Sequence, residues 1–74
     1  MSWNYRVIEK KDGTGTTFAI HEVYYDEEGS PYLCTINAVA PMGETLEDLR
    51  ADVKFYNTAL EKPVLDYETI VGRE

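Results

Sequence analysis

The chain has 74 residues and a formal net charge of -7, with 14 acidic side chains against 7 basic ones. A chain of this length makes a single domain, residues 1–74, with a thin hydrophobic core. Nucleic acids and anionic membranes attract clustered basic residues, so the acidic balance argues against both as partners. We therefore expect a protein partner, and electrostatics favour one with a basic surface.

Three β-prone segments fill the first half of the chain. Alternating apolar and polar residues predict strands at about residues 3–10, 16–25 and 32–39. Residues 11–15 and 26–31 contain the Asp, Gly and Pro residues that are typical of turns. The three strands are therefore expected to form one antiparallel sheet through two hairpins.

The clearest local signal is one amphipathic helix at about residues 45–61. Thr45 can act as the N-cap, and Pro63 cannot continue a helix. Residues 63–74 are then expected to form a short extended tail. Apolar residues recur at spacings of three and four and form one stripe on the helix: Leu46, Leu49, Val53, Tyr56 and Leu60.

These elements predict an α+β fold with the order β-β-β-α, in which the helix stripe covers one face of the three-stranded antiparallel sheet. The residues expected to face the helix are Trp3, Tyr5, Val7, Phe18, Ile20, Cys34 and Ile36. The opposite face is expected to be either a second interface or an ordinary hydrated surface, and it carries Ile8, Ala19, Val23, Tyr25 and Leu33. Because so short a chain buries little surface alone, we expect a homodimer.

The segment from Gly43 to Lys54 resembles the strand-to-helix junction of HicB-type antitoxins, in which a Gly-acid-Thr turn opens the helix after a three-stranded sheet. The Trp-Asn-Tyr-Arg start and the Lys-Pro-Val-Leu-Asp sequence at 62–66 are similar to a group of short bacterial proteins. The resemblance implies an antitoxin-like neutraliser of a protein partner. Leu49 departs from the family, which typically has a small residue there. The few residues after Leu60 are too short for the DNA-binding segment that usually follows.

The chain has one histidine, His21, and one cysteine, Cys34. On the predicted strands these side chains point to opposite faces, so no imidazole activates the thiol. The carboxylates at 26–28 lack the spacing of a calcium loop, and residues 13–15 lack the rest of a phosphate-binding loop. We therefore expect no catalytic residue, no cofactor and no metal site.

Aromatic side chains remain as candidates for function, since Tyr and Trp are enriched in binding hot spots. Three tyrosines flank the acidic turn and one phenylalanine lies off the helix stripe, which gives four candidate partner contacts: Tyr24, Tyr25, Tyr32 and Phe55. The expected function is a non-enzymatic protein-interaction module.

Two other functions stay open. One is a small hydrolase or transferase that uses His21 with a carboxylate, and the other is RNA binding through aromatic residues of the sheet. The lone cysteine and the lack of an apolar secretion signal in the first residues favour the cytoplasm.

Overall fold

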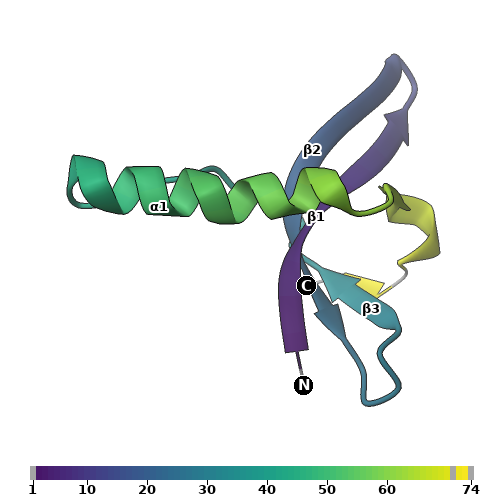
Figure 1. The fold of residues 1–74 in the computed structure, drawn as a ribbon. Coiled ribbons are helices and arrows are strands. Elements are labelled where there is room, and N and C mark those ends of the chain that lie inside the picture. The colour runs from purple at the N-terminus through teal and green to yellow at the C-terminus, as the bar shows by residue number, and fades with distance from the viewer. Residues whose placement is uncertain (1, 71, 74) are drawn as a thin grey trace.

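The predicted antiparallel sheet forms the centre of the molecule. The computed structural model describes residues 2–70 and 72–73, and it is an α+β fold in which a curled sheet carries one long helix (Figure 1). Three strands run antiparallel, and a two-residue strand pairs parallel with each outer one, in the order β4-β1-β2-β3-β5. The strands are β1 (Ser2–Asp12), β2 (Gly15–Tyr25), β3 (Pro31–Cys34), β4 (Leu65–Asp66) and β5 (Gly72–Arg73).

Aspartate side chains shape both hairpin turns. Oδ1 of Asp12 accepts hydrogen bonds from the amide and the hydroxyl of Thr14, each at 2.8 Å. These bonds hold the pKa of Asp12 below its usual value, and the bond from the Thr14 hydroxyl has the largest effect. In the second turn Asp26 Oδ1 accepts from the Ser30 amide at 3.0 Å. Gly29 has a φ of 84° there, which a residue with a Cβ rarely adopts.

The third strand is shorter than predicted and ends at Cys34. Two more bonds keep the chain beside β2, from the Thr35 amide to the Glu22 carbonyl at 3.0 Å and from the Val39 amide to the Ile20 carbonyl at 2.9 Å. From the first bond to the second, the chain after β3 uses four residues, Thr35 to Val39, whereas β2 uses only two, Glu22 to Ile20. The two extra residues interrupt the regular pattern of hydrogen bonds with β2, so the strand ends.

The helix forms where its local signals place it. Helix α1 spans Leu46–Asn57 and continues as the 3-10 helix η1, Thr58–Glu61. Thr45 is the N-cap, and its hydroxyl oxygen accepts a hydrogen bond from the Asp48 amide at 3.0 Å. The predicted extended tail is different, because β4 is followed by a second 3-10 helix, η2 (Tyr67–Thr69). Tail residues 71 and 74 lie outside the described residues.

One small core lies between the sheet and the end of the helix. Tyr5 and Val7 of β1 pack there with Tyr56 of α1 and Ala59 of η1. The Tyr5 and Tyr56 rings are stacked, with their centroids 4.1 Å apart. The predicted contact of Tyr5 and Val7 with the helix is therefore confirmed.

A second core lies on the opposite face of the sheet, which the C-terminal segment covers. It consists of Ile8, Val23, Cys34 and Ile70. The predictions that Cys34 faces the helix and points away from His21 are both wrong, because the register pairs Cys34 with Val23 and directly paired residues share a face. His21 is two residues before Val23 on β2, so its side chain is on the same face as Cys34. A shift of one residue in the pairing moves every side chain of a strand to the other face.

Most of α1 projects beyond the sheet as an arm (Figure 1). The predicted stripe is largely uncovered, since Leu46, Val53 and Leu60 are 63%, 40% and 68% exposed. Tyr56 is buried and Leu49 is half-buried. The prediction that the whole stripe covers the sheet is therefore wrong, and only the C-terminal end of the helix does so.

The segment before the helix explains this path. The Met42 amide donates to Asp52 Oδ2 at 3.0 Å, and the Tyr56 hydroxyl donates to the Ala40 carbonyl at 3.0 Å. A Cβ on Gly43 would lie 2.5 Å from the Leu49 amide nitrogen, so glycine permits this close approach. The chain that leads into the helix thus occupies one side of the arm.

Candidate functional site

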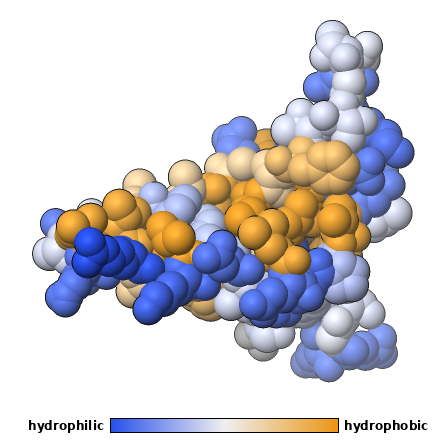
Figure 2. Space-filling view, turned by 45° about the horizontal axis from the view of Figure 1, so that its top comes forward, coloured by the Kyte–Doolittle hydropathy of each residue, from blue (hydrophilic) through white to orange (hydrophobic). Residues whose placement is uncertain are grey.

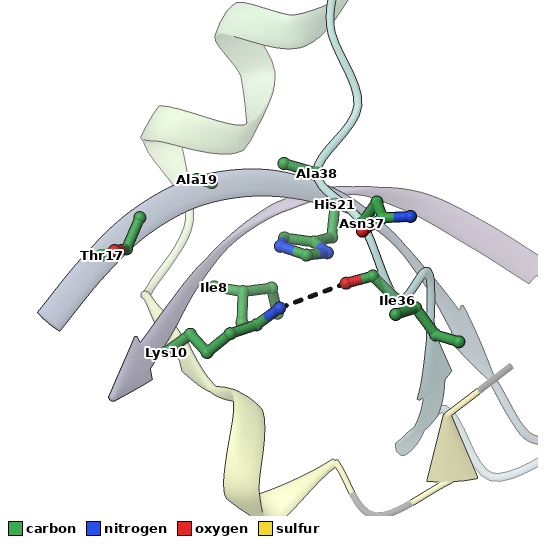
Figure 3. Close-up of a pocket in the computed structure, with 8 residues that line it drawn as sticks. All are labelled: Ile8, Lys10, Thr17, Ala19, His21, Ile36, Asn37 and Ala38. Atoms are coloured by element: carbon green, nitrogen blue, oxygen red, sulfur yellow. Dashed lines mark hydrogen bonds between the residues drawn. The ribbon is translucent and has the colours of Figure 1, made fainter. Parts of the chain in front are cut away.

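His21 lies in a pocket lined by residues of β1 and β2 and by the chain after β3 (Figure 3). Its side chain is only 2% exposed. Nδ1 lies 2.9 Å from the Thr35 carbonyl oxygen, which can only accept, so Nδ1 carries the proton of the neutral ring. Burial lowers the pKa of His21, and the nearby Lys10 ammonium adds to this, while the Thr35 carbonyl opposes it. The lowered pKa favours the neutral imidazole.

The pocket has a volume of about 170 Å³, and its polar lining comes from Lys10, Thr17, His21 and Asn37. Nζ of Lys10 donates to the Ile36 carbonyl at 3.1 Å (Figure 3) and lies 4.3 Å from the centre of the Tyr67 ring. This cation thus joins β1 to the chain after β3 and to η2. No carboxylate is among the lining residues of the described chain. A general base and its orienting acid are therefore not brought together here.

The four candidate contacts do not form one surface. Tyr24 lies across from Trp3 in the β1–β2 register, on the face that meets α1. Tyr25 lies on the opposite face, where its hydroxyl donates to Asn4 Oδ1 at 2.7 Å. Tyr32 is the extra residue of a β-bulge and is 36% exposed. Of the four, Phe55 belongs to α1 itself, and only Tyr24 lies on the face of the sheet that meets this helix.

Aromatic rings gather where the arm joins the sheet. We call this the aromatic cluster: Trp3, Tyr5, Phe55 and Tyr56. The Phe55 ring centre lies 5.0 Å from that of Tyr5 and 6.3 Å from that of Trp3. Trp3 is 46% exposed and Phe55 is 49% exposed. The sequence predicted Trp3 for the core, and its exposure follows only from the way the helix crosses β1.

A second apolar feature, the arm row, consists of Leu46, Val53 and Leu60. Leu46 and Val53 are seven residues apart, close to two turns of α1, and Leu60 follows on η1, so the three side chains lie on the same side of the arm over about 21 Å. Phe55 follows Val53 by two residues, or about 200° around a helix, so it faces nearly the opposite way. Figure 2 shows apolar surface that extends along the arm and continues onto the body.

The part of the chain that the structure describes holds no group of three or more His, Cys, Asp or Glu side chains placed to bind a metal ion. Within the same residues, no helix is both long enough and apolar enough to cross a lipid bilayer. Comparisons with protein-family models, curated proteins and solved structures find no match to this chain. The resemblance to HicB-type antitoxins stays a prediction.

Proposed function

We propose that this chain is a non-enzymatic protein-interaction module that binds another protein through the aromatic cluster. The observation that carries this proposal is the half-exposure of Trp3 and Phe55, 46% and 49%, beside buried Tyr5 and Tyr56. Large aromatic side chains supply most of the binding energy in many interfaces. Here their contacts with Tyr5 already restrict the rings, so little side-chain freedom is lost on binding.

The charges around the aromatic cluster favour a partner with basic residues next to an apolar contact. Glu22 lies across from Tyr5 in the β1–β2 register and accepts a hydrogen bond from the Tyr24 hydroxyl at 2.7 Å. An arginine or lysine of the partner would gain from this carboxylate and from the face of the Trp3 ring. If the partner is a basic toxin, this chain would act as an antitoxin-like neutraliser.

The two alternative functions receive less support. The pocket of His21 has no carboxylate in its lining, which a hydrolase or transferase of the expected kind needs. RNA binding needs free cations beside the stacking rings. The two basic side chains of β1 nearest in sequence lie on the opposite face of the strand from Trp3 and Tyr5, where Arg6 donates to the Pro63 carbonyl at 2.7 Å and Lys10 donates to the Ile36 carbonyl.

Trp3→Ala and Phe55→Ala are each expected to weaken partner binding at least tenfold, a loss of about 1.4 kcal/mol. The partner is first recovered by affinity purification from the native cell at low and moderate salt, and its affinity is then measured by titration calorimetry. Phe18→Ala is the matched control, because Phe18 is a 60% exposed aromatic residue away from the cluster.

Two results would count against this function. One is recovery of no protein partner at either salt concentration. The other is a partner whose affinity is unchanged by Trp3→Ala and Phe55→Ala, or is weakened equally by Phe18→Ala. Circular dichroism of each variant shows whether the fold is kept, so that loss of structure is not mistaken for loss of a contact.

A further inference from the structure

The arm row is apolar surface that the fold does not use. Leu46 and Val53 of α1 and Leu60 of η1 are each at least 40% exposed, and their spacing places them on the same side of the arm. Val53 is seven residues from each of the other two, so the row has a valine at its centre and a leucine at each end. A row with this symmetry matches an identical row turned end for end.

The chain also exposes more surface than its mass requires. Its accessible surface is 5158 Å², whereas a compact monomer of 8.5 kDa is expected to expose about 4,650 Å². The excess is about 500 Å² per chain. Two chains that both covered this excess would bury about 1,000 Å² in total, an area typical of a weak, reversible interface.

We propose that two copies of this chain form a dimer by pairing their α1 arms antiparallel along the arm row. A twofold axis passes near Val53, so that Val53 meets its equivalent and Leu46 of one copy meets Leu60 of the other. Such an isologous contact closes on itself and does not propagate.

Charge favours this direction over a parallel pair. Glu47 and Asp48 lie in the first turn of α1, so a parallel pair would bring four carboxylates and two like helix ends together. The antiparallel pair places each acidic end beside the opposite end of the other helix, which carries Lys54 and Lys62 against one carboxylate, Glu61. The leucines at the two ends of the row are the most exposed of the three, so they would bury the most apolar surface on pairing.

The dimer goes beyond the proposed function and does not compete with it. Phe55 points about 200° away from Val53 around the helix, so the aromatic cluster stays uncovered when the arm rows pair. One dimer therefore presents two aromatic clusters to partners.

Sedimentation equilibrium over micromolar to millimolar concentrations tests the association. We expect the wild-type chain to reach twice its mass of 8.5 kDa. Leu46→Lys/Leu60→Lys should weaken association at least tenfold, because at each end of the row it replaces a leucine–leucine contact between the two copies by two facing ammonium groups. Met42→Lys is the control, since Met42 is 76% exposed and lies outside the row. A wild-type chain that stays monomeric at every concentration, or an equal effect of Met42→Lys, would overturn the proposal.

Cysteine cross-linking tests the direction. Upon mild oxidation the Val53→Cys variant should give a covalent dimer. The Leu46→Cys variant should not, whereas the double variant Leu46→Cys/Leu60→Cys should, because residue 46 of one copy meets residue 60 of the other. Efficient cross-linking of Leu46→Cys alone would show a parallel pair and sink the antiparallel geometry. Trp3→Ala should leave the dimer mass unchanged, so loss of partner binding and loss of the dimer are separate results.

Discussion

Replacement of Tyr56 by alanine is expected to lower the free energy of unfolding by about 3–5 kcal/mol. Tyr56 is the only buried residue of α1, its ring stacks on Tyr5 with the centroids 4.1 Å apart, and its hydroxyl bonds the Ala40 carbonyl. At about 0.05–0.15 kcal/mol per residue, a chain of 74 residues has only about 4–11 kcal/mol in all. Urea unfolding followed by circular dichroism should therefore show a large fall in the urea concentration at the midpoint of unfolding.

Two milder variants make this result interpretable. Tyr56→Phe keeps the ring and loses one hydrogen bond, so it should cost about 1 kcal/mol. Val53→Ala, at a residue of the same helix that is 40% exposed, should cost less than about 0.5 kcal/mol at concentrations where the chain is monomeric. If Val53→Ala costs as much as Tyr56→Ala, the arm row belongs to the core of the chain.

The ionisation of Tyr56 gives an independent test that this side chain is buried, through the dependence of stability on pH. Burial, and secondarily the neighbouring Tyr5, raises the pKa of Tyr56 from 10.0 to about 12. The unfolded phenol loses its proton first, so this contribution to stability is complete below pH 10 and is lost as the pH rises towards 12. Tyr56→Phe should remove this part of the alkaline destabilisation.

Ile8→Ala is the second large effect, and it should cost about 2–5 kcal/mol. Ile8 is fully buried between Val23, Cys34 and Ile70, and it lies beside Leu65 in the β1–β4 pair. The cavity left by the substitution would separate the sheet from the C-terminal segment. The measurement is again the midpoint of urea unfolding.

Two comparisons accompany Ile8→Ala. Ile70→Ala removes the opposite wall of the same core, where the side chain is 1% exposed, and should destabilise by a similar amount. Val64→Ala, at a neighbouring residue that is 50% exposed, should change stability by less than about 0.5 kcal/mol. An unchanged midpoint for Ile70→Ala would mean that the C-terminal segment does not cover this face.

Local signals in the sequence predicted the elements well, because each depends on neighbouring residues. The Thr45 hydroxyl caps the helix within its own first turn, and Asp12 and Asp26 bond amides within their own hairpin turns. Alternation also placed Tyr5 and Val7 on the face that meets the helix. Such features require no knowledge of the tertiary fold.

The path of the helix and the face of Cys34 could not be predicted, because both depend on the register of β3. Tyr24 pairs with Leu33 while Tyr25 pairs with Pro31, so one extra residue enters the strand. No local pattern marks this bulge, and it decides which face each later side chain takes. The chain after β3 then carries the N-terminal end of α1 away from the sheet.

The candidate contact residues were predicted from their positions beside the acidic turn and off the helix stripe, and such positions do not show which side chains share a surface. Tyr24 and Phe55 lie on the side of the sheet that meets α1, whereas Tyr25 is on the other side. Trp3 was predicted for the core because it alternates with Tyr5, and only the crossing of the helix over β1 leaves it half exposed. Surface exposure is a tertiary property, so the aromatic cluster had to be found in the structure.

The radius of gyration tests most directly whether α1 projects as an arm and leaves its apolar row free. Small-angle X-ray scattering of the Leu46→Lys/Leu60→Lys variant, which keeps the chain monomeric, gives this value in solution. We expect agreement with the Cα radius of gyration of 13.0 Å. A value near 11.3 Å, about that of a compact chain of 74 residues, would mean that the helix lies back across the sheet and that the arm row is covered.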